Sequence, residues 1–166
     1  MDLEAQLKRR ACQAFILFCF LWLACSHAEP TIPFDPNIKG LNLVELIEGA
    51  DAIEAINKLH GMPIDVLRGY IAHYEGVNSK ATVWVSEAAT EDLAKEQIDV
   101  MIDKMKNNRR SPFRRYRAWE EKGKRIIAFD GMGQVHYVFK DDRWVYWISA
   151  DGGHIGAIFE HICKTG

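Results

Sequence analysis

Residues 125–150 read RIIAFDGMGQVHYVFKDDRWVYWISA, and this segment gives the clearest indication of the fold class. Three runs rich in β-branched and aromatic residues, Arg125–Phe129, Val135–Lys140 and Trp144–Ala150, are separated by a glycine turn and by a pair of aspartates. Such runs favour strands, and turns this short join neighbouring antiparallel strands. The stretch therefore predicts a three-stranded antiparallel meander.

A second hairpin is predicted upstream of the meander. Residues 64–74 are rich in tyrosine, isoleucine and valine, and in residues 80–86 apolar side chains occupy every second position. The segment between them, Glu75-Gly76-Val77-Asn78-Ser79, has turn composition. Alternation with a period of two indicates a half-buried strand, so the two runs predict a hairpin.

Three helices are predicted from apolar residues that recur every three or four positions. The first spans Leu43–Leu59, with a break considered at Gly49 and Asp51 and a stop at Gly61, and a short third helix spans His154–Cys163. The second spans Glu91–Asn107 and begins after Thr90, a residue suited to cap a helix. Its predicted buried stripe consists of Ala94, Ile98, Met101, Ile102 and Met105.

The resulting order is helix, two strands, helix, three strands, helix. It predicts an α+β fold with a mainly antiparallel sheet of about five strands and with helices packed on one face. We expect a ferredoxin-like or related open sandwich. The chain has 166 residues, of which 48% are apolar and 27% charged, and this composition excludes a wholly disordered or collagen-like protein. One domain accounts for residues 41–166, because no internal linker or repeat interrupts them.

Residues 1–28 have the layout of a signal peptide. A basic run at 8–10 precedes an uncharged, strongly apolar run from Ala11 to Ala24, which is too short to span a bilayer comfortably. The small residues Ser26 and Ala28 favour cleavage after Ala28. Residues 29–40 then form an extended lead-in that contains three of the five prolines.

Two other outcomes for this segment stay open. Leu23-Ala24-Cys25 resembles the end of a bacterial lipoprotein signal, in which Cys25 would be lipidated, although Trp22 stands where a smaller residue is usual. An uncleaved anchor is the third alternative. All three predict an exported protein, either periplasmic or secreted and either free or held at the membrane.

Cleavage after Ala28 leaves Cys163 as the last cysteine, so no internal disulfide framework is expected. Cys163 is interpreted either as a reactive thiol or as a small buried hydrophobe, and the second interpretation is favoured.

Charge is unevenly distributed along the chain. The formal net charge is −2 overall, yet residues 104–125 hold ten basic and two acidic residues and carry +8. The centre of this segment combines arginines with aromatic side chains, which suits the binding of phosphate, sulfate or carboxylate groups. The residues predicted to contact a ligand or partner are Arg109, Arg110, Arg114, Arg115, Tyr116, Arg117 and Trp119.

Three ligand classes and one structural explanation compete for this segment. Anionic lipid headgroups or polyanionic glycans of the cell envelope fit an exported protein, whereas export disfavours nucleic acid. A protein partner is also compatible with it. The structural explanation is that the arginines pair with the protein's own acidic residues, among them Asp92, Glu96, Asp99 and Asp103, while Phe113, Tyr116 and Trp119 enter the core.

An alternative site lies on the predicted aromatic strands. Trp144 and Tyr146 share one face of their strand, and Tyr137 lies on its neighbour, so these three side chains would line a pocket for a small molecule if no helix covered them. Burial of this strand on both faces is the preferred interpretation.

No sequence feature points to a cofactor or to catalysis. His60, His154 and His161 lack metal-ligand spacing, and the sequence contains neither His-Glu-x-x-His nor Cys-x-x-Cys. A Gly-x-Ser-x-Gly elbow is also absent. We therefore predict no metal, no cofactor and no catalytic residue, and a binding function rather than an enzymatic one.

Overall fold

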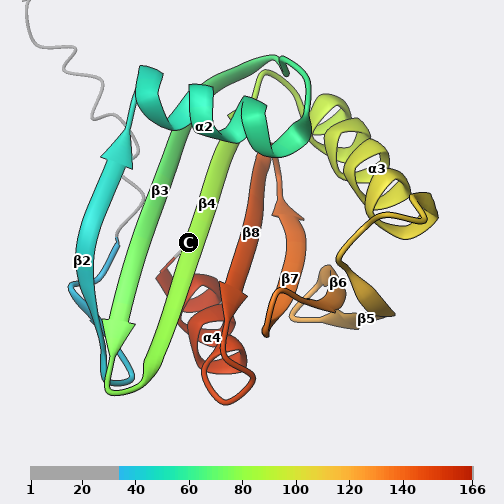
Figure 1. Ribbon diagram of the computed structural model, residues 1–166. Helices are drawn as coiled ribbons and strands as arrows, with labels where there is room; N and C mark the ends of the chain where they lie inside the picture. The colour runs from blue at the N-terminus through green and yellow to red at the C-terminus, as the bar shows by residue number, and fades with distance from the viewer. Residues whose placement is uncertain (1–33, 166) are drawn as a thin grey trace, which may run out of the picture. The chain divides into compact units, whose positions relative to one another are not determined.

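A computed structural model describes residues 34–165, and every structural statement below concerns these residues (Figure 1). They form one mixed α+β domain with three helices and an open antiparallel sheet of eight strands. In chain order the elements are β1 (Asn37–Ile38), β2 (Leu41–Glu48), α2 (Ala50–His60), β3 (Val66–Gly76), β4 (Ser79–Ala88), α3 (Glu91–Asn107), β5 (Arg114–Glu121), β6 (Lys124–Gly131), β7 (Gln134–Asp141), β8 (Trp144–Ala150) and α4 (Ile155–Thr165).

The sheet is built from two antiparallel series that meet in its middle. Strands β1 to β4 and strands β5 to β8 each follow one another in space, and β4 pairs with β8 to give the order β1-β2-β3-β4-β8-β7-β6-β5. Every neighbouring pair is antiparallel. The predicted meander and hairpin are confirmed, whereas the ferredoxin-like arrangement is not.

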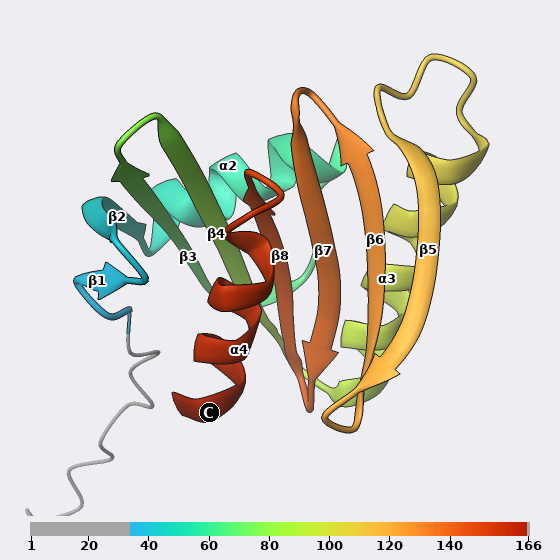
Figure 2. The same ribbon diagram turned by 90° about the horizontal axis from the view of Figure 1, so that it is seen from below.

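The helices cover both faces of the sheet, so the prediction of a single covered face is wrong. Helices α2 and α3 lie on one face, and α4 lies on the other (Figure 2). Side chains alternate along β7 accordingly: Val138 packs in the cluster beneath α3, while the Phe139 ring lies 5.2 Å from the Phe159 ring of α4. The middle of β7 and nearly all of β8 are therefore buried on both faces.

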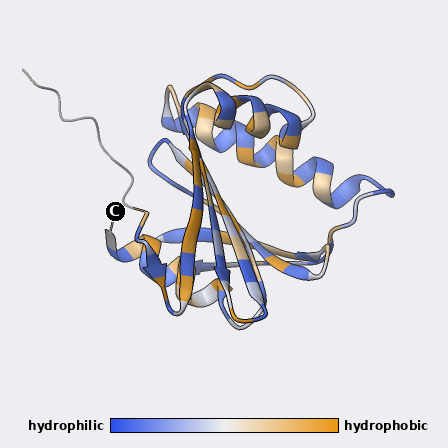
Figure 3. Cartoon of the chain, turned by 60° about the vertical axis from the view of Figure 1, so that its left-hand side comes forward, coloured by the Kyte–Doolittle hydropathy of each residue, from blue (hydrophilic) through white to orange (hydrophobic). Residues whose placement is uncertain are grey.

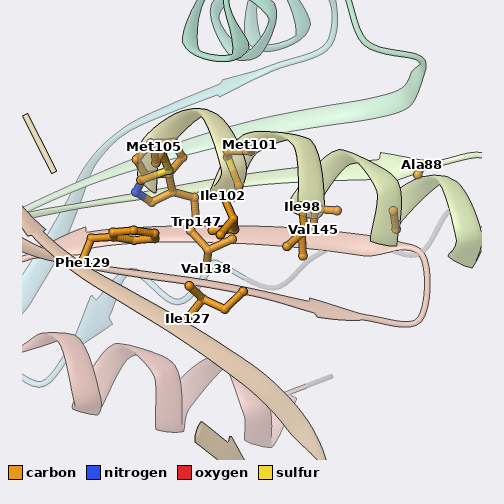
Figure 4. Packing of buried hydrophobic residues seen from close by; sticks show 11 residues of the cluster. Ala88, Ile98, Met101, Ile102, Met105, Ile127, Phe129, Val138, Val145 and Trp147 are labelled. Carbon is orange, nitrogen blue, oxygen red and sulfur yellow. The ribbon is translucent and has the colours of Figure 1, made fainter. Parts of the chain in front are cut away.

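Helix α3 forms as predicted and packs on one hydrophobic cluster of the core. Thr90 caps it by accepting a hydrogen bond from the Leu93 backbone N–H at 3.2 Å. All five residues of the predicted stripe are buried against β4, β6, β7 and β8 (Figure 4). The opposite side of the helix is mostly charged, so the apolar stripe is the side that faces the sheet (Figure 3).

Strands β1 and β5 were not predicted, and strand β2 replaces the first part of a predicted helix. Strand β2 occupies the first part of the predicted helix 43–59, and Gly49, with a φ of 69°, separates it from α2. Strand β5 occupies a stretch expected to be irregular, and Asn37–Ile38 of the predicted lead-in form β1. The predicted stop at Gly61 is confirmed.

The predictions for residues 1–28, including signal cleavage and lipidation of Cys25, lie outside the described residues. Between residues 34 and 165, none of the helices combines the length and apolarity needed to cross a lipid bilayer.

Candidate anion-binding site

The loop after α3 carries the centre of the basic segment and is held in place by hydrogen bonds within the loop. The Asn108 side chain accepts a hydrogen bond from the Arg110 N–H at 2.9 Å, and the Asn108 carbonyl accepts one from the Ser111 N–H, also at 2.9 Å. The Ser111 hydroxyl in turn accepts one from the Phe113 N–H. These bonds give the loop a defined shape, with Arg109 and Arg110 exposed at its tip.

Phe113 anchors this loop to the sheet. Its ring lies 6.2 Å from that of Phe129, 5.7 Å from that of Trp147 and 5.0 Å from the imidazole of His136, in edge-to-face arrangements. Aromatic pairs in this geometry stabilise beyond the area they bury. Phe113 therefore enters the core, as one interpretation of the segment required, while the arginines on either side of it stay outside.

His136 forms the neutral floor beneath Phe113. The Trp147 indole N–H donates to Nδ1 of His136 at 3.1 Å, so Nε2 carries the proton and donates to the Gly131 carbonyl at 3.0 Å. Burial lowers the pKa of His136 below its usual value, and the Gly131 hydrogen bond and Asp130 oppose this only in part. The anchor beneath the loop is therefore uncharged at neutral pH.

Gly131 provides the space that the Phe113 ring occupies. A Cβ atom at this position would lie 2.6 Å from Cδ1 of Phe113 and 3.2 Å from the Pro112 carbonyl oxygen. We expect Gly131→Ala to lower the free energy of unfolding by about 1–3 kcal/mol, because a crowded core residue must shift. Urea unfolding followed by circular dichroism measures the change.

Gly152→Ala is the matched control, because a Cβ there would meet only Val135 Cγ2, at an ordinary 3.6 Å. We expect that substitution to change stability by less than about 0.5 kcal/mol. Equal unfolding midpoints for the two variants would show that Phe113 does not depend on the space at Gly131.

A β-bulge at the start of β5 divides the predicted site residues into two groups. Arg114 pairs with Asp130 and Arg117 pairs with Ala128, so Arg115 and Tyr116 together oppose a single residue of β6. Arg115 has a φ of 55°, a left-handed conformation that glycine usually adopts at such bulges. Beyond the bulge, Trp119 packs on Tyr137 on the α4 face of the sheet, with ring centroids 5.3 Å apart.

The first group surrounds an open groove between the end of α3 and the start of β5. The groove has a volume of about 420 Å³. Its floor includes Phe129 and the Tyr116 ring, over which the Lys106 ammonium lies 4.6 Å from the centroid. The lining residues are Lys106, Asn107, Asn108, Arg109, Phe113, Arg114, Arg115, Tyr116 and Phe129. Four predicted residues thus meet here, and Arg110 stands beside them in the loop.

The groove keeps most of its positive charge. Asp130 is its acidic neighbour, with one carboxylate oxygen 2.6 Å from Nε of Arg115 and the other 2.6 Å from Nη2 of Arg117. Arg114 donates to the backbone carbonyls of Ser111 and Phe113, which do not cancel its charge. Among the described residues, Arg109 and Arg110 form no ion pair.

The acidic residues of α3 do not neutralise these arginines. Asp99 pairs with Lys95 at 2.8 Å, and Asp103 accepts a hydrogen bond from Asn107. The arginines of this segment that do form ion pairs, Arg115 and Arg117, both pair with Asp130, a residue predicted from the sequence to lie in a turn. The proximity of Asp130 could not be read from the sequence, since it depends on the pairing of β5 with β6.

The aromatic residues of the alternative site lie along one sheet face and do not converge. Tyr146 is stacked on Phe139 at 4.9 Å, and burial raises its pKa to about 12. Tyr137 packs against Phe159 of α4 at 6.2 Å, and Trp144 lies 6.4 Å from Tyr70 at the far end of β8. Helix α4 thus packs on Tyr137 through Phe159, whereas Trp144 and its neighbour Tyr70 are both half-buried.

The histidines and Cys163 form no metal centre and no nucleophilic site among the described residues. No group of three or more metal-binding side chains occurs within the described residues. Burial lowers the pKa of His60, with Lys104 as a smaller cause, and burial raises the pKa of Cys163. A raised pKa keeps Cys163 as a thiol at neutral pH, which does not favour a nucleophilic role.

The described residues thus form an α+β domain with a basic groove, lined in part by aromatic side chains, at one edge of its eight-stranded sheet. Comparison with protein-family models, with curated proteins and with solved structures finds no significant match.

Proposed function

We propose that this protein is a non-enzymatic binding domain that holds a polyanion bearing phosphate or sulfate groups in the groove between α3 and β5. The observation that carries the proposal is the set of exposed cations around the groove, of which Arg109 and Arg110 have no acidic partner among the described residues. Guanidinium groups bind tetrahedral oxyanions by donating two parallel N–H hydrogen bonds.

The shape of the groove favours a polymer over a small metabolite. Small-molecule sites are concave and enclose most of their ligand. This groove is open, and its lining combines the cations Lys106, Arg109, Arg114 and Arg115 with the rings of Tyr116 and Phe129. Such a lining suits an extended chain whose anionic groups meet several cations in turn.

The proposed export of the protein indicates which polyanions it would meet. The layout of residues 1–28 supports export to the periplasm or beyond, with or without a lipid at Cys25. An exported protein meets anionic glycans and lipid headgroups at the cell envelope. Both sources share the chemistry that the groove would recognise.

Binding of soluble probes tests the proposal. We expect the full chain to bind heparin and long-chain polyphosphate and to ignore neutral dextran, as measured by isothermal titration calorimetry. Vesicles with and without phosphatidylglycerol, assayed by sedimentation, then separate a headgroup ligand from a polymer. If neither anionic polymer nor anionic vesicle binds better than its neutral counterpart, the proposed function is wrong.

A further inference from the structure

Strand β5 is the long open edge of the sheet. It pairs only with β6 among the described strands, whereas β1 at the opposite edge has two residues. The hairpin from β5 to β6 turns through Lys122 and Gly123, whose φ values of 51° and 71° define a type I′ turn. The residues that flank such a turn, Glu121 and Lys124, form a hydrogen-bonded pair.

This turn fixes which backbone groups of β5 face outwards. Since N–H and C=O directions alternate along a strand, those of Glu121, Trp119 and Arg117 point towards β6. The N–H and C=O of Ala118 and Glu120 therefore point to the open edge. Proteins usually block such an edge with charges or a bulge, and the bulge at Arg115 does so in the first part of β5 only.

The straight part of β5 is complementary to a second copy of itself. Arg117, Trp119 and Glu121 share one face, with Arg117 and Glu121 placed symmetrically about Trp119. In an antiparallel pair of β5 strands centred on Trp119, Arg117 of each copy would lie opposite Glu121 of the other. Opposite charges in directly opposed positions stabilise a strand pair.

We propose that two copies of this protein pair through residues 117–121 of β5, with the two-fold axis at Trp119, and thereby join their sheets into one. Ala118 then exchanges backbone hydrogen bonds with Glu120 of the second copy. The two Trp119 rings face each other in the closer, non-hydrogen-bonded position. Each ring is already held from below by Tyr137 and by its indole N–H, which donates to Glu121 at 2.9 Å.

The bulge then has a second consequence. It ends the pairing at Arg117, so the loop and the groove before it stay outside the contact. The antiparallel arrangement places the two grooves at opposite ends of the paired strands. This inference does not depend on the proposed function, because none of its contacts involves Arg109, Arg110 or Arg114.

Charge reversal with rescue tests the pairing. We expect the full chain to sediment as a dimer, and Arg117→Glu or Glu121→Arg alone to weaken dimerisation about tenfold or more, since each change opposes like charges twice per dimer. The double variant Arg117→Glu/Glu121→Arg should return to within about threefold of the unchanged protein. Arg110→Glu makes the same charge change outside β5 and should leave the dimerisation constant unchanged.

Ala118→Pro provides a second, independent variant. The Ala118 N–H points away from β6, so proline there removes no internal ladder bond but removes a donor to the second copy. We expect a folded monomer by circular dichroism and sedimentation. A wild-type monomer, a dimer insensitive to both single charge reversals, or a double variant that stays monomeric would each overturn the inference.

Discussion

Replacing Glu87 with glutamine is expected to lower the free energy of unfolding by about 3–5 kcal/mol, the largest effect of any single substitution proposed for this domain. Glu87 lies on β4 with its side chain completely buried. Its two carboxylate oxygens face two guanidinium groups, with Arg68 Nε at 2.5 Å and Arg143 Nη2 at 2.7 Å. Arg68 also lies over the Trp144 ring, 5.6 Å from its centroid.

The expected loss of stability comes from the positive charge of the two arginines that remain after the substitution. Glutamine has nearly the same shape as glutamate, but it leaves two arginines close together without an anion between them. Removing the buried carboxylate is strongly destabilising, because the two neighbouring guanidinium groups lose their counter-charge and, at 25% and 40% exposure, regain only part of their hydration. Since whole domains are stable by about 5–15 kcal/mol, this substitution removes a large share of that stability.

Glu75→Gln is the matched control for Glu87→Gln. Glu75 pairs with Lys80 at 2.9 Å, but both side chains are largely exposed. Exposed ion pairs contribute about 0–1 kcal/mol, so we expect a correspondingly small change in the urea unfolding midpoint. Similar losses for the two variants would show that burial does not strengthen the Glu87 contacts.

Reversing the charge of both loop arginines, Arg109→Glu together with Arg110→Glu, is expected to weaken heparin binding about 100-fold or more. Each charge near a polyanionic surface contributes about 1 kcal/mol, and this double variant changes the local charge by four. Neither arginine has an ion-pair partner among the described residues, so we expect the unfolding midpoint to stay unchanged. Calorimetric titration and urea unfolding measure the two quantities separately.

Lys58→Glu together with Lys164→Glu is the control for this double variant. Both lysines are exposed, on α2 and α4, and the substitutions change the net charge by the same amount. We expect a loss of affinity below about threefold, because charges more than a Debye length apart are screened. Equal losses of heparin affinity for the two double variants would show that binding depends on the net charge of the protein and not on the groove.

The parts of the fold that could be predicted from the sequence are those whose pattern is local. The stripe of α3 repeats at helical spacing because one side of the helix is buried and the other is charged. The turns on either side of β7 are short, so the meander could also be predicted from the sequence. In both cases the burial that selects the residues acts within a single element.

Strands β2 and β5 could not be predicted, because their positions depend on distant partners. In β2, Leu46 and Ile47 fit a helical repeat that continues into α2, and only pairing with β3 makes this segment a strand. In β5 nearly every side chain is exposed, so no alternation of apolar and polar residues marks it. An edge strand exposed on both faces has no local pattern.

The charge of the candidate site could be predicted from the sequence, but the arrangement of its residues in space could not. Clustered arginines and aromatic residues marked the segment, yet the bulge at Arg115 turns Arg117 and Trp119 away from the groove that Arg109 and Arg114 line. Lys106 and Asp130 joined the site only through folding. Glu87 gave no signal, because its arginine partners lie on β3 and before β8.

The salt dependence of heparin binding to the full chain tests whether the groove between α3 and β5 binds polyanions. Binding through cations releases counterions, so the logarithm of the association constant should fall linearly with the logarithm of the salt concentration. With three to four groove cations engaged, we expect a slope of about −3, and a slope shallower by about two for Arg109→Glu/Arg110→Glu. A slope near zero, or an equal slope for both proteins, would contradict the assignment of the groove as a polyanion-binding site.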